Sequence, residues 1–309
     1  MTRWYGHLTL SSRLRCSSDE TFPFTPRRNS LKQALQETWF PHKPEEAGKQ
    51  MNLTYHPGLP QECRMDLRFP VAPQRRAPVL LYVHGGGWHV GTKTQGLPLV
   101  RRMNQEGWVG ATITYRMSPS HHHPAPVEDV LQALTYLQEN AERYSLDPER
   151  IVLAGGSAGA HLVSLGAFQA QARGLPVLAC AAFYGIYDVM NPFRETSPYP
   201  AARQVLSSYL TPSIISTPSL LREASPRHCV PEKPVPFLLV QGSNDSLVDS
   251  REMSLFGEKL REQGGKVTEI LVPGLQHAFD VLPTVAAHQV CQPVSAWLNF
   301  QAQRDCSAG

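Results

Sequence analysis

Residues 151–159 read Ile-Val-Leu-Ala-Gly-Gly-Ser-Ala-Gly, an apolar run that leads directly into a turn of small residues. The run predicts a buried β-strand, and the residues from Ala158 onward predict a helix. A Gly-x-Ser-x-Gly pattern between a strand and a helix is typical of a nucleophile elbow, a sharp turn that exposes one serine. Gly155 and Gly159 are expected there because a Cβ at either position would collide with the opposing backbone. Ser157 is therefore the candidate nucleophile.

Strand-like and helix-like segments alternate at short intervals along most of the chain. Apolar, β-rich runs cover 51–55, 64–69, 79–83, 109–115, 151–154, 177–184, 236–240 and 267–272. Apolar residues with helical spacing lie at 97–104, 127–137, 158–170, 253–260 and 290–297. This alternation predicts an α/β fold, with a mostly parallel central sheet covered by helices on both faces.

Two segments depart from the alternation. Residues 1–50 lack sustained periodicity and are expected to form an N-terminal arm or cap segment, with a short helix over 31–40. Residues 186–233 are rich in Pro, Ser and Tyr and are too long for a simple connection, which predicts a lid or pocket-forming insertion. The expected organisation is one catalytic domain over 51–309 that carries this insertion.

Composition argues against several classes of protein. Lys and Arg number 29 against 26 Asp and Glu, so no basic surface for nucleic acid is expected. No apolar window has the length of a membrane span or of a signal peptide's central region, which predicts a cytoplasmic protein without stable membrane insertion. The Arg- and Ser-rich, acid-poor start leaves a transit peptide as the alternative, although the same composition is ordinary for a disordered arm. The six cysteines are far apart without a Cys-x-x-Cys pair, and unpaired thiols are expected.

A serine hydroxyl becomes an effective nucleophile when a base takes its proton and a third group orients that base. Asp245 and His277 each lie on a loop that follows a predicted strand. Ser, Asp, His is the chain order of α/β-hydrolases, and strand ends are where an open α/β sheet places its site. Asp249 is the alternative acid, but it stands directly before a predicted helix with Glu252 three residues on, which favours a capping role.

Eleven other histidines compete with His277. His121, His122 and His123 form a run before Pro124, but adjacent residues on an extended chain point to alternate sides and converge poorly on one ion. An exposed loop is favoured there over a metal site. His277 is favoured as the base because its loop completes the triad order.

A glycine run, His84-Gly85-Gly86-Gly87-Trp88, follows the predicted strand 79–83. Attack on an ester carbonyl produces an oxyanion, which fixed backbone N–H groups stabilise best. Consecutive glycines allow the backbone to bend inward without obstructing side chains. The run therefore predicts an oxyanion hole, with a plain glycine turn as the alternative interpretation.

Together these segments resemble the α/β-hydrolase superfamily and, within it, the hormone-sensitive-lipase-like esterases. The resemblance covers about 51–300 and is carried by 84–88, Tyr115-Arg116, Pro124-Ala125 with Asp129, and 155–159. It implies no metal or organic cofactor. It also implies a catalytic triad of Ser157, Asp245 and His277. The oxyanion hole would be formed by the backbone N–H groups of Gly86, Gly87 and Ala158.

Some residues depart from the pattern of that group. Many members carry an acid before the nucleophile, where this chain has Gly156, and Asp245-Ser246-Leu247 stands where Asp-Pro-Leu is frequent. The segments 155–161 and 84–88 are also similar to bacterial esterases that remove acetyl or feruloyl groups from plant polysaccharides. Kynurenine formamidases are similar in the His-Gly-Gly-x-Trp element. These departures leave the substrate open.

The expected function is that of a serine carboxylesterase acting on small acyl esters, because no long apolar lid helix is evident. An arylformamidase or other amidase and a non-catalytic ligand receptor on the same fold are the alternatives. A small-molecule ester is the expected partner, and a homodimer is left open. Candidate pocket walls, with core packing as the alternative for each, are Trp88 and Tyr187 and, after them, Phe193, Tyr199 and Tyr209.

Overall fold

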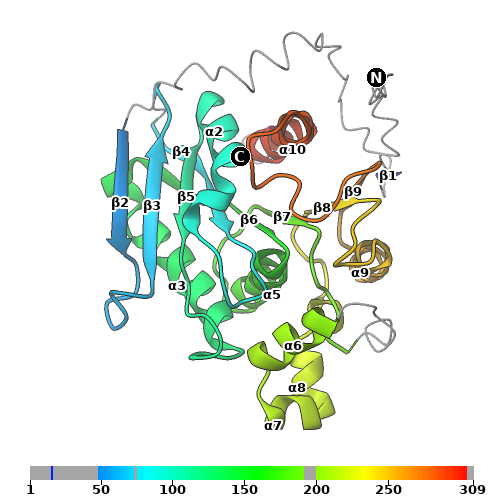
Figure 1. The fold of residues 1–309 in the computed structure, drawn as a ribbon. Helices are drawn as coiled ribbons and strands as arrows, with labels where there is room; N and C mark the ends of the chain where they lie inside the picture. Colours follow the sequence, from blue (N-terminus) through cyan, green and yellow to red (C-terminus); the bar gives the residue numbers. More distant parts are fainter. Residues whose placement is uncertain (1–14, 17–47, 73–74, 191–199, 305–309) are drawn as a thin grey trace, which may run out of the picture.

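The computed structural model describes residues 15–16, 48–72, 75–190 and 200–304, and these form a layered α/β structure (Figure 1). Its strands join one sheet in the order β1-β9-β8-β7-β6-β4-β5-β3-β2. The strands are β1 (Arg15–Cys16), β2 (Gly48–Thr54), β3 (Arg64–Phe69), β4 (Ala77–Val83), β5 (Val109–Ile113), β6 (Leu146–Gly156), β7 (Ala179–Phe183), β8 (Phe237–Gly242) and β9 (Val267–Val272).

The sheet is parallel from β5 through β4, β6, β7 and β8 to β9, and antiparallel where β3, β2 and β1 join it. The predicted α/β architecture with a mostly parallel sheet is confirmed. The helices are α2 (Leu97–Gln105), α3 (Ala125–Glu139), α4 (Ala141–Tyr144), α5 (Ala158–Ala172), α6 (Pro200–Tyr209), α7 (Pro212–Ser216), α8 (Pro218–Glu223), α9 (Arg251–Glu262) and α10 (Val285–Arg304).

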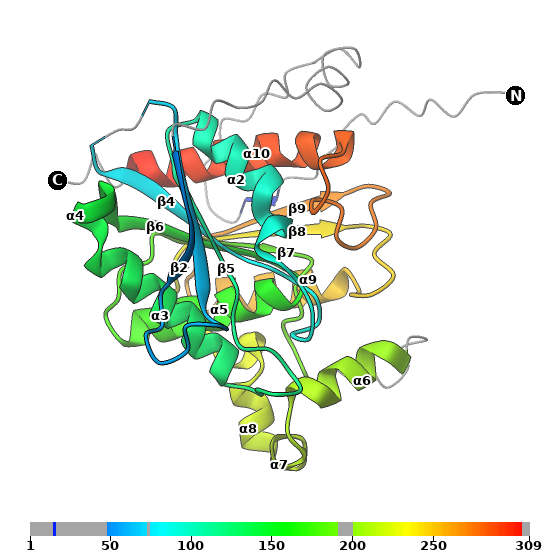
Figure 2. The same ribbon diagram turned by 60° about the vertical axis from the view of Figure 1, so that its left-hand side comes forward.

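Helices cover both faces of the sheet (Figure 2). Side chains of β4 alternate between the two layers: Leu81 and Val83 pack with α3 and α5, whereas Leu80 and Tyr82 pack with α2 and α10. Because every residue of β4 is buried, this strand lacks a polar face, as expected for a parallel strand with helices on both sides. The two apolar layers hold the strand ends in fixed positions.

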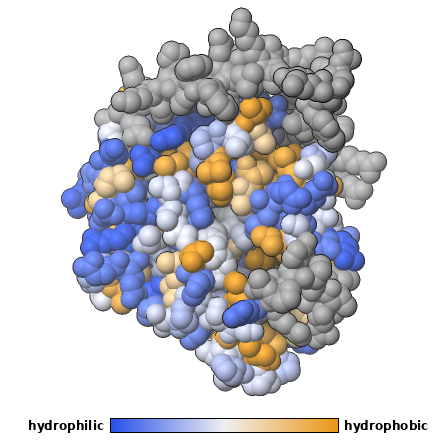
Figure 3. Space-filling model, viewed as in Figure 1, coloured by the Kyte–Doolittle hydropathy of each residue, from blue (hydrophilic) through white to orange (hydrophobic). Residues whose placement is uncertain are grey.

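Parts of the 1–50 segment belong to the sheet. Arg15 and Cys16 pair with Glu269 and Thr268 of β9, and β2 begins at Gly48. The expected helix over 31–40 lies outside the described residues. Edge strand β2 is largely exposed, and the surface near it is mainly hydrophilic (Figure 3), a composition that discourages strand addition at the edge.

The described part of the segment 186–233 contains the short α-helices α6, α7 and α8, which lie together beyond α5 in both views (Figures 1 and 2), and a 3-10 helix at Pro226–His228. Each of them begins with a proline, and Thr211 caps α7 by accepting a hydrogen bond from the Ile214 N–H at 3.2 Å. A role of this insertion as a lid remains a prediction. Among the described helices none is long and apolar enough to cross a bilayer.

Candidate active site

Ser157 lies at the turn between β6 and α5, in a backbone conformation that serine seldom adopts. Its φ is 56° and its ψ is −120°, which is a strained region for a residue with a Cβ. The turn is held by the Ser157 N–H, which donates to the Phe183 carbonyl at 2.9 Å. A Cβ on Gly159 would lie 2.1 Å from the Val83 carbonyl oxygen, so close packing of α5 against β4 requires glycine there. Ser157 is thus locked at the carboxyl ends of the parallel strands.

His277 lies between Ser157 and Asp245. Its Nε2 is 2.9 Å from the Ser157 hydroxyl oxygen, and its Nδ1 is 2.7 Å from Oδ2 of Asp245. Because a carboxylate can only accept, the proton of a neutral imidazole belongs on Nδ1, which leaves the Nε2 lone pair facing the hydroxyl. The structure therefore brings the three predicted residues together in the geometry of a nucleophile, a base and an orienting acid.

The Asp245 side chain is fully buried and its two oxygens are occupied. Oδ1 accepts the N–H groups of Leu247 and Val248, each at 2.9 Å, and Oδ2 accepts from Nε2 of Gln241 at 2.8 Å as well as facing His277. Gln241 is itself fully buried at the end of β8. Its role in fixing the acid was missed in the sequence, where a polar residue ending an apolar strand was the available signal.

Asp249 lies outside this arrangement. It accepts hydrogen bonds from the backbone and the guanidinium of Arg251, each at 2.9 Å. The residue that precedes α9 is Ser250, and Oε2 of Glu252 accepts the N–H groups of Tyr187 and Asp188. Asp249 thus serves the start of α9 rather than His277.

The glycine run bends sharply after β4. Gly86 and Gly87 have φ values of 111° and 61°, and a Cβ on Gly86 would overlap the Val90 carbonyl. Within the described residues, the N–H groups of Gly86, Gly87 and Ala158 donate to no other protein group. A Cβ on Gly85 would lie 3.1 Å from the Ser157 Cβ, which places this loop directly beside the elbow. These three N–H groups are therefore available donors near Ser157.

His84, at the start of the loop, supports it from within the core. Its fully buried ring stacks on Tyr115 with 4.5 Å between centroids, and its Nδ1 lies 2.8 Å from the Gly85 carbonyl. Burial lowers the pKa of His84 to about 4, so the ring is neutral at physiological pH. Further along, Arg116 forms an ion pair at 2.7 Å with the buried Asp129, which fixes the segment after β5 against α3.

Trp88 and Tyr187, the predicted substrate-binding residues, occupy different environments. Trp88 is buried beside the glycine loop, where its ring stacks on Tyr209 of α6 with 4.3 Å between centroids. Tyr187 is buried too, but its ring stacks on Phe256 of α9 at 4.2 Å, which is core packing rather than a pocket wall. The other two candidates, Phe193 and Tyr199, lie outside the described residues.

Helix α6 lies against the glycine loop. A Cβ on Gly87 would lie 2.4 Å from a methyl carbon of Val205, so this valine covers the Gly87 backbone. The end of α6 is held by two histidines: His122 Nδ1 lies 2.9 Å from the Ser208 carbonyl, and His123 Nδ1 lies 3.0 Å from the Tyr209 hydroxyl. His121 instead pairs with Glu62 at 3.0 Å. The three adjacent rings thus have three separate partners.

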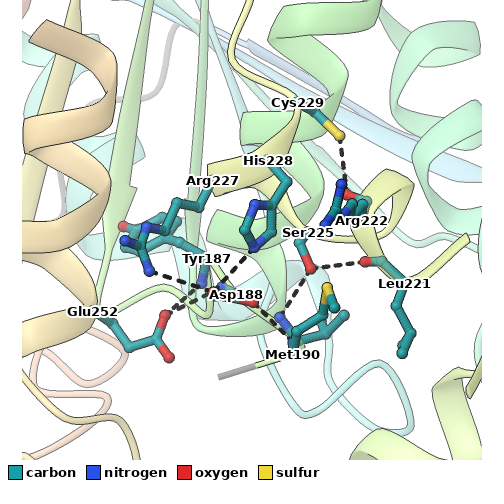
Figure 4. A network of polar contacts seen from close by, with 11 residues as sticks. Tyr187, Asp188, Met190, Leu221, Arg222, Ser225, Arg227, His228, Cys229 and Glu252 are labelled. Carbon is teal, nitrogen blue, oxygen red and sulfur yellow. Dashed lines mark hydrogen bonds and ion pairs between the residues drawn. The ribbon is translucent and has the colours of Figure 1, made fainter. Parts of the chain in front are cut away.

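Two buried acids connect the insertion to α9 (Figure 4). Oε2 of Glu252 accepts the N–H groups of Tyr187 and Asp188, each at 3.2 Å. Oδ2 of Asp188 in turn lies 3.2 Å from Nε2 of His228 and 3.4 Å from Arg227. This network fixes both ends of the segment that carries α6, and so helps to hold Val205 and Tyr209 at the glycine loop.

Other chemistry-bearing groups have structural surroundings. The cysteines whose side chains are described, Cys63, Cys180, Cys229 and Cys291, are free thiols, and burial raises the pKa of each. In the described part of the chain, no cluster of three or more His, Cys, Asp or Glu side chains is arranged to hold a metal ion.

A comparison with family models matches residues 65–260 to BD-FAE. The chain belongs to the BD-FAE family. The BD-FAE match includes the glycine run, the elbow and Asp245, and it ends before His277.

Individual relatives are described as esterases. Esterase LipQ of Mycobacterium tuberculosis is 35% identical over 84% of this chain and 64% of its own length, and Esterase LipC of the same organism is 31% identical over 74% and 59%. The chain thus spans less than two thirds of either relative. Among solved structures, a bacterial heroin esterase has a TM-score of 0.72 at 24% identity, covering 82% of this chain and 83% of that one, which shows a shared fold. The predicted membership in the hormone-sensitive-lipase-like α/β-hydrolases is confirmed.

Proposed function

We propose that this protein is a serine carboxylesterase that hydrolyses small acyl esters through an acyl-enzyme. The observation that carries the proposal is the hydrogen-bonded series Ser157–His277–Asp245, with contacts of 2.9 and 2.7 Å. Membership in the BD-FAE family and similarity to LipQ and LipC, which are described as esterases, support the choice of ester over other acyl substrates.

In the first half of the proposed reaction, Ser157 Oγ attacks the ester carbonyl while Nε2 of His277 takes its proton. The carbonyl oxygen becomes an oxyanion that accepts hydrogen bonds from the N–H groups of Gly86, Gly87 and Ala158. The carbon–oxygen bond to the alcohol then breaks, and His277 returns the proton to the leaving alkoxide. The products are the free alcohol and an acyl group on Ser157.

In the second half, water replaces the alcohol. His277 takes a proton from the water as it attacks the acyl carbonyl, and the same N–H groups stabilise the second oxyanion. Collapse returns the proton to Ser157 and releases the carboxylic acid. Throughout, Asp245 holds the tautomer of His277 and stabilises the imidazolium that forms at each attack.

The preference for small acyl groups is supported by α6. Val205 covers the backbone of Gly87, and Tyr209 stacks on Trp88, so side chains fill the space beside one proposed oxyanion donor, Gly87, and beside the residue that follows it. A long acyl chain bound there would have to displace them. We therefore expect acetyl and butyryl esters to be turned over faster than long-chain esters.

A series of p-nitrophenyl esters, from acetyl to hexadecanoyl, tests the proposal. Wild-type protein should show its highest kcat/KM with the short esters, and Ser157→Ala should lose activity by several orders of magnitude. Ser164→Ala is a matched control, because this serine is buried in α5 and donates to the Ala160 carbonyl at 2.7 Å. Faster turnover of hexadecanoyl than of acetyl esters would contradict the substrate class, and turnover of an aryl formamide in preference to all esters would indicate an amidase.

A further inference from the structure

Tyr184 and Asp280 form a buried pair directly behind His277. Tyr184 follows the end of β7, Asp280 lies three residues after His277, and the tyrosine hydroxyl donates a hydrogen bond to Oδ1 of Asp280. Both residues are almost fully buried. Neither has a role in the proposed triad or oxyanion hole.

Tyr184 lies against both His277 and Gly156 of the elbow. Its ring centroid lies 4.6 Å from that of His277, at an interplanar angle of 59°. A Cβ on Gly156, the residue before the nucleophile, would lie 2.6 Å from the tyrosine hydroxyl oxygen. Gly156 therefore leaves the space that the hydroxyl occupies, and one tyrosine spans from the elbow to the base.

The backbone at Tyr184 supports a functional rather than an incidental placement. Its φ is 40°, in the left-handed region that a bulky residue rarely adopts, and its N–H donates to the Val240 carbonyl at 2.7 Å. Such conformations persist where the surrounding structure imposes them, and they cluster at active sites.

Burying the charged form of the Asp280 carboxyl group is energetically unfavourable. Burial raises its pKa to about 6, while the Tyr184 hydroxyl and the nearby His277 partly offset that effect. The Tyr184 hydroxyl donates to the Asp280 carboxyl, and the other ionisable groups that interact with it electrostatically include Tyr82, Cys291 and His277. At pH 8 the carboxylate is thus charged in an apolar layer, and an isosteric neutral group would be easier to accommodate.

We infer that Tyr184 and Asp280 are a positioning pair for His277: Asp280 fixes the tyrosine ring, and the ring holds the imidazole in line with Ser157 Oγ. The negative charge of Asp280 also interacts with His277, and it would favour the imidazolium formed during each attack. This inference rests on the proposed function, because it assigns the pair a task in the triad's reaction.

The test uses Asp280→Asn, Tyr184→Phe and the double variant, with kcat and KM measured for p-nitrophenyl acetate at pH 8. Tyr184→Phe keeps the ring and removes the hydrogen bond, and Asp280→Asn keeps the shape and removes the charge. We expect kcat to fall about tenfold in each while KM stays unchanged, because small misplacement of a catalytic base slows chemistry more than binding. The double variant should be no slower than the slower single variant, because both act through one pair.

Unfolding in urea separates positioning from a general loss of structure. Asp280→Asn should be at least as stable as the wild type at pH 8, although it is slower. Asp147→Asn is the matched control: this buried acid at the opposite end of β6 pairs with Arg150 at 2.8 Å, so its variant should lose stability and keep kcat.

The inference is overturned if Asp280→Asn retains the wild-type kcat, or if its kcat falls only in parallel with its stability. Additive losses in the double variant would also contradict a single pair. These outcomes differ from failure of the proposed function, in which wild-type protein itself would hydrolyse no ester and the inference would fall with it.

Discussion

Oδ2 of Asp245 lies 2.7 Å from Nδ1 of His277. Asp249, four residues later, contacts Arg251 instead. Substituting each of the two acids in turn therefore tests which carboxylate orients His277.

Asp245→Asn should lower kcat by about four orders of magnitude, because an amide in this position favours the wrong tautomer of His277. Asp249→Asn should leave kcat unchanged and lower the free energy of unfolding by at most about 1 kcal/mol, since it weakens contacts at the start of α9. Steady-state kinetics with p-nitrophenyl acetate measure both. A large loss in Asp249→Asn with normal activity in Asp245→Asn would exchange their roles.

Val205→Ala should widen the acyl preference. Removing its methyl groups clears space beside Gly87, and kcat/KM for hexanoyl relative to acetyl esters should rise about tenfold. Gln204→Ala, an exposed neighbour on α6, is the matched control and should keep the wild-type profile. An unchanged ratio in Val205→Ala would show that this helix does not limit acyl length.

Gly159→Ala should destabilise the elbow. The added Cβ would meet the Val83 carbonyl at 2.1 Å and the His84 carbonyl at 2.7 Å, and backbone atoms cannot move aside cheaply. We expect a loss of about 3 kcal/mol or more in the free energy of unfolding, measured in urea. Gly48→Ala meets no atom within 4 Å and should change stability by less than about 0.5 kcal/mol. Equal effects at the two positions would argue against close packing of α5 on β4.

His84 makes stability depend on pH. Burial lowers its pKa from 6.5 to about 4, so between these values the unfolded chain binds a proton that the folded protein does not. The contribution of neutral His84 to the free energy of unfolding is therefore fully present above pH 6.5. About 3 kcal/mol of it is lost as the pH falls toward 4. Urea unfolding from pH 4 to 7 should show a steeper fall for wild type than for His84→Asn. Parallel curves would show that His84 is not the source of the dependence.

Much of the fold follows from local sequence. The strands at 64–69 and 267–272 have the bounds that their sequences predict. The alternating pattern of the first is followed by Pro70, and the short apolar run of the second is followed by Pro273. The elbow and the choice of Asp245 over Asp249 also follow from local arguments, because strand ends converge in a parallel sheet.

Other features depend on contacts between distant residues or on short elements. Helices α7 and α8 carry too few turns for a clear apolar period, and the repeated Thr-Pro at 211–212 and 217–218 was the available signal. The Tyr184–Asp280 pair joins residues 96 positions apart, and nothing in either local sequence indicates the other. Tyr187 could be assigned to the core only once its stacking on Phe256 was seen.

In the proposed mechanism, Ser157 carries the acyl group of the acyl-enzyme. Mixing the protein with excess p-nitrophenyl acetate, quenching in acid within the first turnovers and mapping the peptides by mass spectrometry tests it directly. We expect an acetyl group on the peptide that contains Ser157 in the wild type, and none on that peptide in Ser157→Ala. An acetyl group on another residue that turns over at the steady-state rate, or ester hydrolysis by Ser157→Ala at the wild-type rate, would contradict it.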